Sequence, residues 1–227
     1  MWIDPQDGAV ARTHSDIRNL RPNWSGGHVI TDEQIEGIDP PLLPVTLTTP
    51  EYDPLTQDAT ELAPALNGEV WIQRWAITNK LPEQVDAEHQ VAVDAQWEKI
   101  KAERDGPRVE SGVQVGADWF HTDAASRIKW LGVKDSARDV LSAGGTTADR
   151  IQVRGKPLSW KTMAGAFVPV TVQLTLDVVQ AVKDLDAAVF ECAELHNIAM
   201  RKATNPGAYD YSTGWPDRYT QDQHQEE

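Results

Sequence analysis

The sequence predicts an α+β protein with three parts: an irregular, proline-rich and β-containing N-terminal part, a connector helix, and a compact C-terminal domain of short β-hairpins packed with a long amphipathic helix. Three observations predict this class. Six prolines gather between residues 40 and 64, a helical pattern runs through residues 82–104, and a longer helical pattern follows Thr171. We therefore divide the chain into an N-terminal β and extended-arm region (1–80), the connector helix (81–107), the compact domain (108–207) and an extended C-terminal tail (208–227).

The proline-rich run of residues 38–66 predicts an extended arm. Proline lacks a backbone N–H and fixes φ, so these prolines argue against a helix or a central strand. The run is nevertheless too apolar for a free linker. Its apolar side chains can pack on the protein's own second half or on a neighbouring protein, and we expect the neighbour. The candidate partner-binding residues of the arm are Leu42, Leu43, Val45, Leu47 and Tyr52.

Residues 68–78, with the sequence GEVWIQRWAIT, predict a strand. Bulky side chains occupy both sets of alternate positions, which favours a strand with something packed on each face. Trp71 and Trp75 are further candidate partner-binding residues, because tryptophan is enriched at interface hot spots. Pro82 fits the first position of the connector helix, and we expect Asp105-Gly106-Pro107 to end that helix.

The second half predicts short hairpins and helices. We expect a hairpin about Gly116-Ala117-Asp118, a helix over 124–131, a second helix over 136–144, and strands on either side of Ala164-Gly165. Thr171 is a good N-cap for the longest helix, whose apolar residues recur at steps of three and four. This spacing approaches a heptad seam, so the helix either self-associates as in a coiled coil, giving a homo-oligomer, or docks on its own domain. We favour docking, because alanines dilute the seam.

Composition narrows the function. The 227 residues carry a formal net charge of −14, with a sequence pI near 4.8, which disfavours nucleic acid and anionic membranes as partners. Cys192 is the only cysteine, so the chain has no internal disulfide framework. No run of about 18 apolar residues and no secretory signal stands out. We therefore expect synthesis in the cytoplasm and no membrane span.

The stretch DWFHTDAASRIKW, residues 118–130, is the part of the sequence that most resembles a catalytic or metal-binding site. His121 and Asp123 could share one face of a strand and hold a metal, but they are two ligands where a specific site needs three or four. The alternative is structural: Asp123 caps a helix, Trp119 and Phe120 fill the space between hairpin and helix, and His121 bonds to a backbone partner. We favour the structural interpretation.

Other catalytic signatures are missing from the sequence. The run SAGGTTADR has glycines but no phosphate-loop lysine, and no Gly-x-Ser-x-Gly motif occurs. Cys192 and His196 fall on the apolar side of the last helix, where a buried thiol is inert. We therefore expect no enzyme, no catalytic residue, no metal and no cofactor, but a binding or assembly protein.

Several stretches resemble an uncharacterised domain family found in bacteriophage and prophage tail and tail-fibre-assembly proteins. The matching stretches are WEKIKAERD, SGVQVGADWFHTDAASRIKWLG, LSWKTMAGAFVPVT, DAAVFECAELHNIAM and YDYSTGWP. The first part, with THSDIRNLRPNWS and GEVWIQRWAI, is similar to openings of these proteins. The motif residues, expected to be structural, are Trp119, Phe120, His121, Asp123, Ser126, Arg127, Trp160, Lys161, Thr162, Gly165, Phe167 and Thr171. Among them we expect Trp160 and Phe167 to share one buried face.

The resemblance implies a non-enzymatic structural protein of the tail tip or baseplate, present in the virion, that attaches or supports a fibre or receptor-binding protein. The alternative is a tail-fibre assembly chaperone that is not retained in the virion. A cell-wall hydrolase has less support, because no acid/base pair was found. The expected partners are other tail or baseplate proteins or the fibre, and Tyr209, Tyr211 and Trp215 in the tail complete the candidate partner-binding residues.

Overall fold

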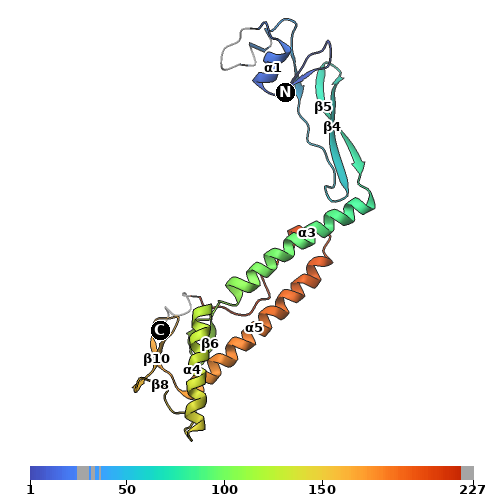
Figure 1. Cartoon of the computed structure of the whole chain (residues 1–227). Coiled ribbons are helices and arrows are strands. Elements are labelled where there is room, and N and C mark those ends of the chain that lie inside the picture. Colours follow the sequence, from blue (N-terminus) through green and yellow to red (C-terminus); the bar gives the residue numbers. More distant parts are fainter. Residues whose placement is uncertain (25–30, 32–33, 36, 221–227) are drawn as a thin grey trace. The chain divides into compact units, whose positions relative to one another are not determined.

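The computed structural model describes residues 1–24, 31, 34–35 and 37–220 and confirms the α+β class. The chain divides into two compact units, Met1–Ala87 and Glu88–Glu227, each described below by itself. Figure 1 shows the elements of both units. Within the described residues, no helix combines the length and the apolarity that crossing a membrane requires.

The N-terminal unit is built on a five-stranded sheet with the order β2-β1-β3-β5-β4. Its strands are β1 (Trp2–Ile3), β2 (Val10–Ala11), β3 (Leu43–Thr46), β4 (Gln57–Asn67) and β5 (Val70–Asn79). β1 runs antiparallel to β2 and β3, β3 runs parallel to β5, and β4 and β5 form a long antiparallel hairpin (Figure 1). β4 is therefore an edge strand.

One short helix, α1 (His14–Leu20), covers part of this unit. Thr13 and Asp16 form a reciprocal capping box that satisfies the first free N–H groups of the helix. Ile17 of α1 packs in a small core whose buried members are Ala11, Ile17, Ile35, Ile38 and Leu42. Beside it, Arg21 pairs with Asp4 at 2.6 Å, and both side chains are nearly buried.

The expectation that the proline-rich run contains no central strand is wrong. β3 contains Pro44 and lies between β1 and β5. The strand tolerates this proline because it pairs with each neighbour over only two residues, while the adjacent Val45 N–H donates to the Met1 carbonyl at 3.0 Å. Pro64 fits the ordinary rule, since it lies on the edge strand β4 where the register shifts between Leu62 and Ala65.

Helix α3 (Pro82–Glu103) begins at Pro82 as predicted and crosses the boundary between the units. The expected stop at Asp105-Gly106-Pro107 is only partly right. The α-helix ends at Glu103, but a π-helical turn, η1 (Arg104–Arg108), follows it and contains Pro107. Proline is accommodated there because a wider turn leaves room for the ring that a regular α-helix lacks.

The C-terminal unit contains three short hairpins and two further helices. The hairpins are β6 (Val113–Val115) with β7 (Asp118–Phe120), β8 (Gln152–Val153) with β9 (Lys156–Pro157), and β10 (Ser159–Lys161) with β11 (Phe167–Pro169). Thr171 caps the last helix, α5 (Val172–Arg201), by accepting a hydrogen bond from the Leu174 N–H. A single 3₁₀ turn, η2 (Pro206–Ala208), follows it.

The two helices expected over 124–131 and 136–144 form one helix, α4 (Ala124–Ser142). The helix continues through Gly132, although glycine costs about 1 kcal/mol relative to alanine within a helix. Trp130 and Ala137 lie on either side of it and are both buried, so tertiary packing offsets that cost. The chain leaves the helix at Ala143, followed by Gly144 with a φ of 88°.

The apolar seam of α5 is buried inside its own unit. It packs against α4 and the β6–β7 hairpin, with Val178, Leu185 and Val189 in a core that also holds Phe120 and Trp130. Further along α5, Ala193 and Met200 meet Val93 and Ile100 of α3 in a second cluster. The seam thus serves docking within the chain, as the favoured interpretation had it.

Candidate functional site

The β4–β5 hairpin carries the largest set of exposed apolar side chains in the N-terminal unit. Leu62, Leu66, Val70 and Ile77 are 37%, 57%, 50% and 39% exposed. Leu66 lies opposite Trp71, and Ala59 lies opposite Ile77, whereas Leu62 lies opposite Arg74 and Val70 opposite Asn67. Because side chains alternate along a strand, Leu66 and Ile77 share one face of the hairpin and Leu62 and Val70 the other. Each face of the hairpin therefore presents exposed apolar side chains.

This geometry answers the expectation that something packs on each face of residues 68–78. Within strand β5, Gln73 is the only buried residue, and Trp71 and Trp75 are half-buried. Strand β5 has bulky side chains on both faces, as predicted, but the N-terminal unit covers neither face completely. We call the four exposed residues Leu62, Leu66, Val70 and Ile77, together with Trp71, the hairpin surface.

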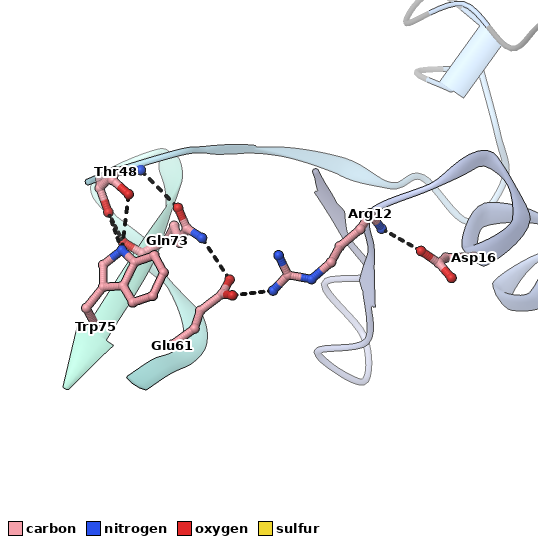
Figure 2. Close-up of polar contacts among 6 residues, drawn as sticks. All are labelled: Arg12, Asp16, Thr48, Glu61, Gln73 and Trp75. Atoms are coloured by element: carbon pink, nitrogen blue, oxygen red, sulfur yellow. Dashed lines mark hydrogen bonds and ion pairs between the residues drawn. The ribbon is translucent and has the colours of Figure 1, made fainter. Parts of the chain in front are cut away.

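A polar network holds the hairpin to its neighbours (Figure 2). Glu61 of β4 pairs with Arg12 at 2.5 Å and accepts a hydrogen bond from the Gln73 amide at 2.9 Å. The Gln73 amide oxygen accepts from the Thr48 N–H at 3.0 Å, and the Trp75 indole N–H donates to the Thr48 carbonyl at 3.1 Å. The hydrogen bond from Arg12, and then the one from Gln73, lower the pKa of Glu61. The network keeps Glu61 ionised and fixes the hairpin against the segments at 12 and 48.

The structure separates the predicted partner-binding residues of the arm into two groups. Leu42 and Val45 are buried, so the expectation that they bind a partner is wrong; they serve the N-terminal unit itself because the arm is part of its sheet. Leu43, Leu47 and Tyr52 are 36%, 63% and 41% exposed and stay candidates.

Residues 208–220, the described part of the expected extended tail, instead lie along the helices of their own unit. Tyr209, Tyr211 and Trp215 are half-buried and pack on the cluster of Val93, Ile100, Ala193 and Met200. The tail is held by hydrogen bonds because Gln96 donates to the Tyr209 carbonyl at 2.8 Å and the Tyr219 N–H donates to Ser111 at 3.1 Å. The three aromatic residues are thus largely occupied within the chain, which corrects their assignment as partner-binding residues.

His196 of α5 is the centre of this packing. Its Nε2 lies 3.0 Å from the Thr213 carbonyl, which only accepts, so Nε2 is the protonated nitrogen. Its Nδ1 lies 3.0 Å from the Tyr209 hydroxyl. One turn earlier, the buried Cys192 thiol donates to the Gly214 carbonyl at 3.2 Å, and burial raises its pKa. The histidine and the thiol are structural here, as the sequence suggested for this helix face.

The stretch 118–130 is a corner between the β6–β7 hairpin and α4. Asp123 caps α4, because its carboxylate accepts from the Ser126 N–H at 3.0 Å and the Ser126 hydroxyl at 2.6 Å. The hydroxyl hydrogen bond, and then the backbone one, lower the pKa of Asp123. Trp119 and Phe120 are buried as expected. The described residues contain no group of three or more His, Cys, Asp or Glu side chains placed to hold a metal ion.

Arg127 binds three segments together at this corner. Its guanidinium donates to the carbonyls of Thr122 and Val109, at 2.5 and 2.7 Å, and to the Asp186 carboxylate of α5 at 2.8 Å. The planar guanidinium suits this fan of acceptors because its donors point in fixed directions. His121 is half-buried and lines a surface hollow with Ser126 instead of bonding to a backbone group.

The β10–β11 hairpin corrects another expectation. Trp160 lies opposite Val168 and stacks on the buried Trp130, with ring centroids 4.0 Å apart. Phe167 lies opposite the exposed Lys161 and is itself 72% exposed, so it is not a core residue. The register places the two aromatic residues on opposite faces.

The turn between β10 and β11 explains two more motif residues. Thr162 is buried and its backbone N–H and hydroxyl bond across the turn to Ala166, at 2.8 and 3.2 Å. Gly165 has a φ of 91°, a conformation that residues with a side chain rarely adopt.

Sequence reasoning missed the hairpin surface apart from Trp71. The prolines led us to treat residues 38–66 as one arm, whereas the exposed residues are divided between the paired strands β4 and β5. The signal was available, because the strand at 70–77 has bulk on both faces, and such a strand needs two partners.

Comparison with known proteins assigns the C-terminal unit to a family. No curated protein and no solved structure matches the chain. One family model matches residues 91–213, which is more than half of the 227 residues and covers most of the C-terminal unit. The chain therefore belongs to the family described as Domain of unknown function (DUF4376).

Proposed function

We propose that this chain is a non-enzymatic structural protein of a bacteriophage or prophage tail, located in the tip or baseplate of the virion. In this role it attaches or supports a fibre or receptor-binding protein. Two things support the proposal: the resemblance of its sequence stretches to tail and fibre-assembly proteins, and the hairpin surface. The partner is thus a fibre or another tail protein.

The observation that carries the proposal is the exposure of apolar side chains on both faces of the hairpin. Leu66 and Val70, at the end of the hairpin, are 57% and 50% exposed. Burying apolar surface stabilises an interface by about 25 cal/mol per Å², which exposed side chains of this size can supply only when a partner covers them. The free outer edge of β4 adds backbone donors and acceptors over 57–62, before the register shift. An added strand from a partner would satisfy them.

Protein mass spectrometry of purified particles tests the role. The particles are those of a phage or prophage that encodes this chain. A stoichiometric amount of the protein in mature particles is the expected result. Absence from the particles, together with missing or misfolded fibres when the gene is deleted, would overturn the structural role and indicate an assembly chaperone.

A paired substitution tests the surface. Leu66→Ser with Val70→Ser should reduce incorporation into particles, because it removes apolar contacts without touching a buried residue. The matched control is Ile128→Ser with Leu131→Ser on α4, whose side chains are 69% and 56% exposed. Equal incorporation of both variants would show that the hairpin surface is not the attachment site.

A further inference from the structure

A surface hollow in the C-terminal unit gathers positive charge in an acidic protein. It lies between the start of α4 and strand β10, and its volume is about 440 Å³. Lys129 and Lys161 contribute ammonium groups, His121 an imidazole and Ser159 a hydroxyl, while Leu158 and Trp160 add apolar surface. We call this the basic hollow.

The two lysines of the basic hollow have no ion-pair partner in the part of the chain that the structure describes. Among the described residues, neither Lys129 nor Lys161 takes part in an ion pair, although the chain has a formal net charge of −14. None of the described carboxylates lines the hollow. Asp123 is close in sequence but does not line the hollow, and its carboxylate already accepts hydrogen bonds from the hydroxyl and the N–H of the lining residue Ser126. The hollow is therefore a local cationic site.

The aromatic side of the basic hollow is held in place. Trp160 stacks on Trp130 at 4.0 Å with an interplanar angle of 24°, and Phe120 meets Trp130 edge-on at 5.7 Å. Trp130 and Phe120 are fully buried. A ligand that contacts Trp160 therefore meets a side chain whose freedom is already lost, which lowers the entropic cost of binding.

This combination selects the ligand. Two ammonium groups beside a tryptophan and a leucine suit a carboxylate next to an apolar side chain. A long polyanion such as nucleic acid would extend beyond the hollow over a chain whose formal net charge is −14, which disfavours its binding. A free small molecule would stay largely uncovered in a hollow that is shallow and open, whereas binding pockets for small molecules enclose most of their ligand. A protein segment continues over the surface around the hollow.

We propose that the basic hollow binds an acidic peptide segment of a partner protein, with Lys129 and Lys161 pairing with aspartate or glutamate and Trp160 and Leu158 contacting a neighbouring apolar residue. This deepens the proposed function and rests on it in one respect, that the segment belongs to a tail partner. It adds a second attachment point, on the other unit, to the hairpin surface.

Fluorescence anisotropy with the purified full-length chain tests the hollow. The probe is a fluorescein-labelled acidic hexapeptide, Glu-Asp-Leu-Leu-Asp-Glu, and the control peptide replaces each acid with its amide. Lys129→Gln with Lys161→Gln should weaken binding of the acidic peptide roughly 2- to 30-fold, the range that two exposed ion pairs supply. Lys156→Gln with Lys202→Gln removes the same charge from exposed positions outside the hollow and should leave binding unchanged. All four substituted lysines are exposed, so both variants should fold.

Three results would overturn the inference. They are equal binding of the amide peptide, equal weakening by both lysine pairs, and tighter binding of a phosphorylated peptide or a short oligonucleotide through the same lysines. The assay needs no particles, so its outcome is separate from that of the particle mass spectrometry. Absent peptide binding by a protein found in particles would contradict only the hollow; peptide binding by a protein absent from them would contradict only the tail role.

Discussion

Asp123 shows how one residue of a family motif acts through local structure. Its carboxylate accepts two hydrogen bonds from Ser126 at the start of α4, so it holds the first turn of a helix that packs on α5. The sequence predicted this cap from the position of an aspartate before a helical pattern. It also predicted the cap at Thr171, where the hydroxyl accepts from the Leu174 N–H at 3.1 Å.

Substituting Asp123 separates the cap from the charge. Asp123→Ala should lower the free energy of unfolding by about 1 kcal/mol, because alanine cannot accept the N–H hydrogen bond. Asp123→Asn should cost much less at neutral pH, since asparagine caps about as well as aspartate. Chemical denaturation of the three proteins measures both effects. An asparagine variant as unstable as the alanine variant would contradict the cap.

The two variants should also differ in pH dependence. Because the pKa of Asp123 is lowered in the folded protein, its charged form contributes stability above the unfolded carboxyl pKa of about 4, and that contribution is lost as pH falls through the folded pKa. The original protein should therefore lose its advantage over Asp123→Asn on acidification below about pH 4. An advantage that stays constant to pH 2 would contradict the assignment.

Trp160 and Phe167 test the register of the β10–β11 hairpin. Trp160→Ala should lower the free energy of unfolding by about 2–4 kcal/mol, near the low end for buried aromatic residues because Trp160 is half-buried. Phe167→Ala should stay within about 0.5 kcal/mol, because Phe167 is 72% exposed. Thermal unfolding of the two variants makes the comparison. Similar losses in both would return Phe167 to the core.

At the scale of elements, the sequence predicted the existence of helices and hairpins better than their limits. The long helices begin at Pro82, Ala124 and Val172, where the capping and proline signals place them. α4 was expected as two helices, whereas it is continuous because Trp130 and Ala137 are buried against residues far along the chain. β3 was missed for the same reason. Pro44 disfavours a strand locally, whereas the pairing with β1 and β5 that forms the strand depends on residues elsewhere in the chain.

The segment that follows α5 offers a prediction at this scale. Tyr209→Phe removes the hydroxyl that bonds to His196 Nδ1 and leaves the ring in place. It should lower the free energy of unfolding by about 1 kcal/mol and speed proteolytic cleavage after residue 205. Tyr211→Phe on the same segment removes a hydroxyl that makes no hydrogen bond within the described residues, and it provides the comparison. Unchanged cleavage in Tyr209→Phe would show that the hydroxyl does not hold the segment.

At the scale of the whole molecule, the sequence predicted the class of the fold but not the roles of its parts. The arm of residues 38–66 was assigned to a partner because prolines disfavour internal strands, yet β3 and β4 belong to the N-terminal sheet. The hairpin surface depends on the pairing of Leu66 with Trp71 across the β4–β5 turn, which was missed because residues 38–66 were assigned to an arm. The basic hollow likewise joins His121 to Lys161, residues from different elements. Contacts between residues far apart in the sequence could not be predicted from the sequence alone.

Hydroxyl-radical footprinting of the hairpin surface tests the central claim most directly. The oxidation rates of Leu62, Leu66, Val70 and Trp71 are compared between the isolated protein and assembled particles, with Phe190 and Ile198 of α5 as exposed references. If the hairpin attaches the protein to its tail partner, these side chains are covered in the particle, and their oxidation should fall severalfold relative to the references. Equal oxidation of the hairpin in the isolated protein and in the particle would contradict the account.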